Sequence, residues 1–158
     1  MKKIDYPYLP EGREIKYVPE DNEFMSEAKN IALQYKGALM QPGGVVVVKD
    51  KRIIGRGSVG MNYHSKHGCE RIKLNFPTGV GYDKCPGCSP ENHSEANAIK
   101  DAIKNGFDAK GADLYLWGHW WFCKDCWDKM IGAGIKNTFL LKNSEILFNK
   151  SHPGNIIQ

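Results

Sequence analysis

The sequence predicts an α/β protein, a three-layer α/β/α sandwich in which helices cover a mixed sheet of about five strands. Three observations support this fold class. A run of four consecutive valines, 45–48, is followed closely by Ile53-Ile54-Gly55, and the two segments predict a hairpin with at least one buried strand. Apolar residues on either side of this hairpin recur at helical spacing. Helical and strand segments then alternate, which is typical of layered α/β folds.

An arm and a helix are predicted before the hairpin. Three prolines among tyrosines and charged residues in segment 1–19 indicate an extended N-terminal arm. A helix is expected after Asp21 and Asn22, because both residues can cap it. Its apolar face comprises Phe24, Ala28, Ile31, Ala32, Tyr35 and Leu39.

Two helices and three strands are predicted after the hairpin and a long loop. The first helix begins at Asn92 and ends at Asn105-Gly106, and the second spans 123–131 and ends at nearby glycines. The inner face of the first helix is expected to comprise Ala96, Ile99, Ala102 and Ile103. The strands are expected at 114–117, 138–141 and 146–148.

Length and composition indicate one domain that spans residues 1–158. Basic residues exceed acidic ones by four without runs of one sign, which neither demands nor excludes an anionic partner such as a nucleotide phosphate. The odd number of cysteines, five, favours metal binding in a reducing compartment over a disulfide framework. Charge and proline precede any apolar run, and no stretch approaches transmembrane length. We therefore expect a cytoplasmic protein without a membrane partner.

Two short segments, His93-Ser94-Glu95 and Cys123-Lys124-Asp125-Cys126, predict a metal centre. Cysteines at i and i+3 share one face of a helical turn, so both sulfurs can bind the same tetrahedral ion. His93 supplies a third ligand, which leaves one position for water. Zinc held by two thiolates and a neutral imidazole can lower the pKa of that water toward neutrality. Glu95 is then a carboxylate that can move protons without binding the metal.

These segments resemble the signature of the zinc-dependent cytidine and deoxycytidylate deaminases. The run 93–99, His-Ser-Glu-Ala-Asn-Ala-Ile, is similar to the family's His-Ala-Glu-x-Asn-Ala stretch, and the pattern is closest to deoxycytidylate deaminases. The resemblance covers about residues 20–142 in element order. It implies a cytidine deaminase-like fold with two metal-bearing helices side by side, and a homo-oligomer. It also implies a sugar contact from Asn62 and a base that stacks on Trp120 or Trp121, with core packing as the alternative for either ring. His119 on the same loop could contact the substrate or pack.

The residues and the resemblance together predict zinc-dependent hydrolytic deamination of a nucleobase. The expected substrate is cytosine in a free (deoxy)nucleotide or nucleoside. His93, Cys123 and Cys126 would bind zinc, and Glu95 would act first as base and then as acid. The family usually has a proline immediately before the first cysteine, where this chain has Trp121-Phe122. A fold that retains zinc but lacks activity is therefore an open alternative.

Four further alternatives stay open. The same chemistry could act on a free purine or on a nucleic-acid base. A non-catalytic zinc module could stack tryptophans on single-stranded nucleic acid, although the lack of a basic run argues against a polynucleotide. Glu95 could cap its helix from Asn92. The cysteine pairs at 85–88 and 123–126 could form one closed four-thiolate zinc site.

A second, structural zinc is predicted in the long loop 63–92. This stretch lacks periodicity and contains three prolines, so something must hold it in place. The resemblance supports a second zinc, since several deoxycytidylate deaminases carry one in the corresponding region. The alternative is that its thiols are small buried apolar side chains. The candidate ligands are Cys69, Cys85 and Cys88 with either His64 or His67.

Overall fold

The computed structural model describes residues 7–35, 43–59, 66–76, 81–149 and 151–156, which fold around a five-stranded mixed sheet. The strands lie in the order β1-β5-β4-β2-β3. β5 is parallel to both β1 and β4, whereas β2 is antiparallel to both β4 and β3. The strands are β1 (Ile15–Val18), β2 (Gly44–Lys49), β3 (Arg52–Ser58), β4 (Asp113–Trp117) and β5 (Asn137–Leu141).

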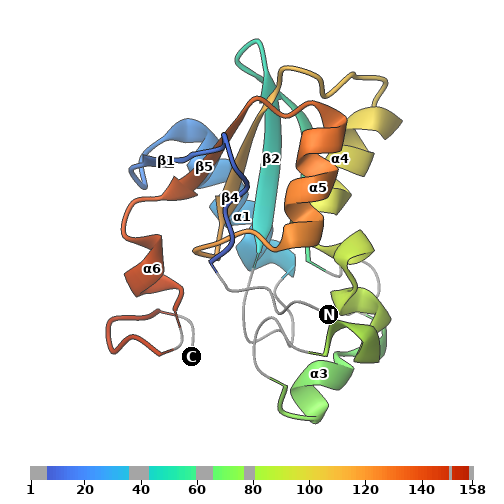
Figure 1. Ribbon diagram of the computed structural model, residues 1–158, viewed down its shortest axis with the longest axis vertical. Helices are drawn as coiled ribbons and strands as arrows, with labels where there is room; N and C mark the ends of the chain where they lie inside the picture. Colours follow the sequence, from blue (N-terminus) through green and yellow to red (C-terminus); the bar gives the residue numbers. More distant parts are fainter. Residues whose placement is uncertain (1–6, 36–42, 60–65, 77–80, 150, 157–158) are drawn as a thin grey trace.

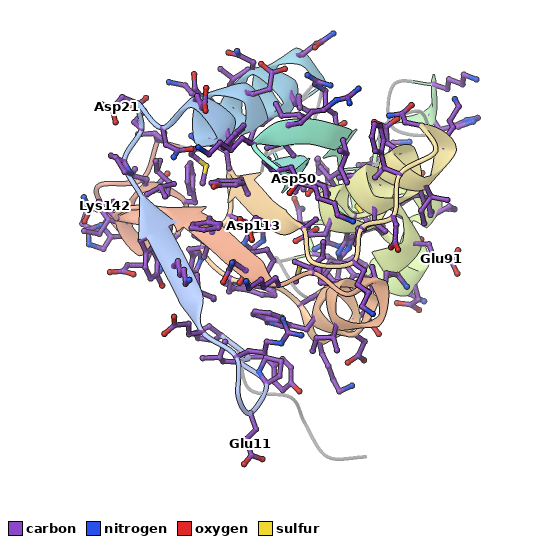
Figure 2. All side chains as sticks on the ribbon, turned by 90° about the horizontal axis from the view of Figure 1, so that it is seen from above. Glu11, Asp21, Asp50, Glu91, Asp113 and Lys142 are labelled. Carbon is purple, nitrogen blue, oxygen red and sulfur yellow. The ribbon has the colours of Figure 1, made fainter. Side chains whose placement is uncertain are left out.

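Helices cover both faces of the sheet, so the predicted three-layer fold is confirmed. α1 (Glu23–Tyr35) lies on one face, and α4 (Ser94–Lys104) and α5 (Lys124–Ala133) lie side by side on the other (Figure 1). Figure 2 shows from above how the sheet separates α1 from α4 and α5. Within the described ranges, none of the helices combines the length and apolar character needed to cross a bilayer.

The central position of β2 explains the run of four valines. Val45 and Val47 pack in the core between the sheet and the pair α4 and α5. Val46 and Val48 pack in the core on the side of α1. Successive side chains of a strand point to opposite faces, so a strand buried on both faces reads as a continuous apolar run. The valines therefore require a helical layer on each side of the sheet.

Two glycines of β3 allow α4 to approach the sheet at backbone distance. A Cβ atom at Gly57 would collide with the backbone of Ser94 and Ala98. A Cβ atom at Gly55 would collide with the backbone of Ala98 and Ala102, one turn further along the helix. Glycine in a strand is typical of such a close approach by another backbone. This packing fixes the position of α4 and of the residue that begins it.

The fifth strand differs from the predicted one. The prediction of a strand at 146–148 is wrong, because this segment belongs to the helix α6 (Ser144–Leu147) and the residue after it. An apolar run of three residues is too short for its periodicity to separate helix from strand. The fifth strand is β1, which lies within the segment 1–19 expected as an extended arm and pairs in parallel with β5. Its two central residues are exposed, so it has little apolar pattern.

The start and the inner face of α4 also differ from expectation. The helix begins at Ser94 with His93 as its N-cap, and Asn92 lies in the 3-10 helix η3 (Pro90–Asn92). Ile103 is 63% exposed and does not face the core as predicted. Ile103 follows the buried Ala102 in the chain, but successive residues of a helix lie about 100° apart around its axis, so the two side chains face different directions.

The described part of the loop 63–92 contains short helical turns instead of being structureless. These turns are α3 (Glu70–Lys73), η1 (Tyr82–Lys84) and η2 (Pro86–Cys88). Figure 1 shows this segment below the N-terminal ends of α4 and α5.

Leu39, expected on the apolar face of the first helix, lies outside the described residues.

Candidate metal centre

The N-termini of α4 and α5 bring the three predicted ligands together. His93 is the N-cap of α4, Cys123 is the N-cap of α5, and Cys126 lies in the first turn of α5. The Nδ1 atom of His93 lies 3.2 Å from the sulfur of Cys126 and 3.5 Å from that of Cys123. The two sulfurs are 3.0 Å apart. Two thiols and one imidazole, all buried, therefore surround a single point.

His93 has the orientation and tautomer that a metal ligand needs. Its Nε2 atom lies 2.8 Å from the carbonyl oxygen of Cys88, and because a carbonyl only accepts, Nε2 donates the proton. Nδ1 is then the ring nitrogen that faces the two sulfurs and can bind a metal once it carries no proton. The ring of Tyr82 meets the imidazole edge-to-face, with 4.8 Å between the ring centroids. A hydrogen bond to the distal nitrogen is the usual way that proteins orient a histidine ligand.

The donor set fits a zinc ion. Zn–S bonds of ~2.3 Å and Zn–N bonds of ~2.1 Å separate the ligand atoms of a tetrahedral site by roughly 3.5–3.8 Å. The three atoms here lie 3.0, 3.2 and 3.5 Å apart, so a small separation of the two sulfurs would admit zinc, and both cysteines are free thiols. The backbone N–H of Cys126 also donates to the sulfur of Cys123, which favours the thiolate at this helix N-terminus. Three protein ligands leave a fourth position open, as in catalytic zinc sites.

The protonation of the group follows from its close contacts. A hydrogen bond from Cys126 lowers the pKa of Cys123 to about 5, against the opposing effect of burial. A hydrogen bond to Cys123 and burial raise the pKa of Cys126 well above its ordinary value. Burial lowers the pKa of His93, but the hydrogen bond and charge of Cys123 outweigh it, so the net pKa rises. The metal-free group thus holds one thiolate and retains protons that zinc must displace.

Glu95 lies beside the three ligands without being one of them. Its side chain is buried, contacts the Cys126 thiol and accepts a hydrogen bond from Ser94 Oγ at 3.3 Å. Burial raises the pKa of its carboxyl, and the positive charge of His93 partly opposes this effect. A carboxyl with a raised pKa is suited to accept a proton and return it. The capping role from Asn92 is not formed, because the helix is capped at His93.

Asn97 supports the metal centre, although sequence reasoning did not single it out. The only signal for it in the sequence is its position within the run 93–99. Its side-chain amide donates to the carbonyl oxygens of Ser58 and Asn92, at 2.8 and 3.0 Å. These bonds tie the end of β3 and the turn η3 to the first turn of α4. They therefore hold in place the chain segment that carries the histidine ligand.

A second group of ligand atoms consists of Cys69, Cys85 and Cys88. Their sulfurs all lie within 4.8 Å of one another, and those of Cys69 and Cys88 are 3.4 Å apart. The cysteine pairs at 85–88 and 123–126 thus belong to different groups, and the structure does not form the closed four-thiolate alternative.

Neither histidine that was predicted as a fourth ligand is assigned by the structure. His64 lies outside the described residues. His67 is described, but the ligand atoms that gather within 4.8 Å include only the three cysteines. A second zinc site with a histidine ligand therefore stays a prediction.

Three of the four residues predicted to contact substrate are described, and they lie in the segment before α5. Asn62 lies outside the described residues. His119 and Trp120 are half-buried, whereas Trp121 is buried in the core beneath α4 and α5. The rings of His119 and Trp121 meet edge-to-face at 4.7 Å. The segment leads directly into the ligand Cys123, but its contact with substrate stays a prediction.

The chain belongs to the family described as the cytidine and deoxycytidylate deaminase zinc-binding region, whose model matches residues 18–142. This match contains the three ligands at the N-termini of α4 and α5, as well as the second cysteine group. The α/β sandwich described above is therefore a cytidine deaminase-like fold, and zinc is the metal of its family.

Solved structures similar to this chain carry several deaminase names. A diaminohydroxyphosphoribosylaminopyrimidine deaminase/5-amino-6-(5-phosphoribosylamino)uracil reductase from Thermotoga maritima is 28% identical, with a TM-score of 0.46; the match covers 74% of this chain and 28% of that one. A guanine deaminase from Bacillus subtilis is 24% identical, with a TM-score of 0.49 and coverages of 83% and 72%. A dCMP deaminase from cyanophage S-TIM5, in complex with dCMP and dUMP, is 21% identical, with a TM-score of 0.47 and coverages of 81% and 88%.

This chain therefore spans less than a third of the Thermotoga protein. No curated protein matches it.

Proposed function

We propose that this protein is a zinc-dependent hydrolase that deaminates a nucleobase, with cytosine in a free (deoxy)nucleotide or nucleoside as its substrate. One observation carries the proposal: Glu95 is a buried carboxyl in contact with one ligand of a three-ligand zinc group. Family membership supports the reaction class, because the family is described by its cytidine and deoxycytidylate deaminases. A carboxylate beside a three-ligand zinc is the arrangement that nucleobase deamination uses.

The residues of the chain divide the chemistry between them. Zinc on His93, Cys123 and Cys126 would lower the pKa of water at its open position toward neutrality. Glu95 accepts a proton from the attacking water as its oxygen bonds to the ring carbon that carries the amino group. Glu95 then passes this proton to the adjacent ring nitrogen. The second proton of the water follows the same route to the amino group, the C–N bond breaks, and ammonia leaves.

Burial of Glu95 serves both halves of this proton transfer. Burial destabilises the ionised form of the carboxyl, so Glu95 binds a proton more tightly than a carboxyl in water does and its pKa is raised. The contact with Cys126 keeps the carboxyl beside the ligands that would hold the metal. The same group can therefore act as base in the first step and as acid in the second.

The loop before α5 is proposed to form the wall of the base pocket. His119 and Trp120 are half-buried and have ring surface that can face a ligand, and Trp121 supports the imidazole of His119 from the core. An aromatic ring can stack on the flat face of a base. Asn62 is proposed to contact the sugar.

Ammonia release from a panel of compounds tests the proposal. The panel contains cytosine, adenine and guanine as free bases, nucleosides, nucleotides and single-stranded deoxyoligonucleotides, each with zinc-loaded protein and with the Glu95→Gln variant. We expect release from a cytosine nucleoside or nucleotide by the unchanged protein only. Release only from a purine or from a deoxyoligonucleotide would move the substrate within the same chemistry. No release from any compound, with salt-sensitive binding of a single-stranded oligonucleotide, would overturn the proposal.

A further inference from the structure

Three buried thiols form a small core of their own outside the sheet. Cys69, Cys85 and Cys88 are 5%, 0% and 4% exposed, and the side chains of Ile72 and Tyr82 pack against them. This cysteine cluster is separate from the two cores that flank the sheet. The turns around it, α3, η1 and η2, contain only three or four residues each. Turns this short are not stable alone, so the segment depends on its tertiary contacts, and the cluster is the buried part of them.

The chemistry of the cysteine cluster suits a soft divalent cation. Its three sulfurs lie within 4.8 Å of one another, and all three are free thiols. Thiolate ligands select zinc-like cations over calcium or magnesium. Three thiolates and one divalent cation carry a net charge of minus one, and a cation nearby would balance it. Arg71 lies there: it contacts the Cys88 thiol, and its guanidinium lies 4.6 Å from the centroid of the Tyr82 ring.

The cysteine cluster touches the histidine ligand of the first metal group at two points. Cys88, whose sulfur belongs to the cluster, accepts the hydrogen bond from Nε2 of His93 through its carbonyl. Tyr82 packs against the cysteines and also meets the imidazole edge-to-face. Any change that loosens the cluster therefore releases both contacts that orient His93.

We propose that Cys69, Cys85 and Cys88 bind a structural zinc ion, and that this second site positions His93 for the first zinc through the Cys88 carbonyl. The second ion would lock η2, and with it the direction of that carbonyl. Cys88 is thus a positioning residue for the first site. The inference rests on the zinc group of the proposed function but not on its deaminase activity.

Metal content tests the first half of the inference. The unchanged protein is expected to hold two zinc ions per chain, the Cys85→Ser and Cys123→Ser variants one each, and the double variant none. Lys84→Ala serves as the control, because Lys84 is exposed on η1 next to Cys85 and forms an exposed ion pair with Asp83. One zinc per chain, unchanged in Cys85→Ser, would overturn the second site. A disulfide between Cys69 and Cys88 in freshly purified protein would overturn it as well.

Competition with a zinc chelator tests the second half. If the cysteine cluster positions His93, the zinc that remains in Cys85→Ser should bind about 10- to 100-fold more weakly than the first-site zinc of the unchanged protein. Coupling between two sites is reciprocal, so the zinc that remains in Cys123→Ser should weaken by the same factor. Equal first-site affinity in Cys85→Ser and in Lys84→Ala would mean that the cluster only supports its own segment, and would overturn the positioning role.

A measurement on the unchanged protein covers the case in which Cys85→Ser does not fold. X-ray absorption at the zinc edge counts sulfur ligands: the average is two and a half per zinc if both groups are filled, and two if only the first is. An average of two would overturn the second site. These readouts need no turnover, so an inactive protein with two coupled zinc ions would refute the proposed function and leave this inference intact.

Discussion

Glu95 in the first turn of α4 contacts the thiol of Cys126 in the first turn of α5. The proton-transfer group and the metal ligand therefore come from two helices that meet at their N-termini. Neither helix alone forms the site, and the sheet that both helices cover sets their spacing. Changes at the carboxyl, at the ligands and at the helix–sheet contact should thus have separable effects.

Replacement of Glu95 by glutamine should remove turnover and leave zinc in place. Glutamine keeps the shape of the side chain but cannot accept a proton, and general acid–base catalysis contributes about 10²–10⁴-fold to a rate. We expect kcat to fall by at least this factor, with an unchanged zinc content. The control is Glu91→Gln, because Glu91 is exposed and points outward (Figure 2). A Glu95→Gln variant with kcat within about tenfold of the unchanged protein would exclude Glu95 as the catalytic carboxylate.

Zinc binding at the first group should release protons and weaken as the pH falls. The pKa of Cys126 is raised well above its ordinary value, so this thiol keeps its proton in the metal-free protein at neutral pH, and the raised pKa of His93 favours its protonated form. Zinc needs the thiolate and the neutral imidazole, so it must displace these protons. Each displaced proton lowers the apparent affinity about tenfold per pH unit on acidification. Calorimetry of zinc binding to a Cys85→Ser background, in two buffers of different ionisation enthalpy at pH 7, should detect at least about one proton. No net release would contradict the protonation described here.

The sequence predicted those parts of the fold and site in which side chains carry the signal. The valines 45–48 indicated a strand buried on both faces, and the spacing of Cys123 and Cys126 indicated two sulfurs on one helical turn. Both are confirmed. β1 escaped prediction because its central residues are exposed, and its place in the sheet depends on a strand more than a hundred residues away.

A second kind of structural feature has no side-chain signal at all. The carbonyl of Cys88 that orients His93 is a backbone group, which every residue has, and its direction depends on the fold of the segment around it. Likewise, Gly57 gives no sign in the sequence that a helix backbone lies against it. Backbone contacts of this kind become visible only when the elements are placed in space.

Replacement of Gly57 by alanine should separate α4 from the sheet. The new methyl group would collide with the backbone of Ser94 and Ala98, which cannot move aside as a flexible side chain can. Overpacking of this kind costs about 1–3 kcal/mol, and here it also displaces the N-terminus of α4 that carries the ligand. We expect a lower thermal midpoint and a weaker first-site zinc affinity.

Gly132→Ala is the matched control for Gly57→Ala. Gly132 lies in α5, and nothing is within 4 Å of a Cβ atom built there, so alanine should stabilise the protein by about 0.5–1 kcal/mol. Thermal denaturation of the two variants should therefore shift in opposite directions. A Gly57→Ala protein as stable as the unchanged one would show that α4 does not pack on β3 at backbone distance.

Replacement of Asn97 by alanine should weaken both stability and zinc binding. Its amide donates to the carbonyl oxygens of Ser58 and Asn92, and the loss of donors to partly buried carbonyls costs about 1–3 kcal/mol. Because these bonds fix the turn before His93, the variant should also bind the first zinc less tightly. Asn105→Ala is the control, since Asn105 donates to the Ile54 carbonyl at the other end of α4. It should lose stability but keep its zinc affinity, and equal zinc affinities in the two variants would refute the positioning role of Asn97.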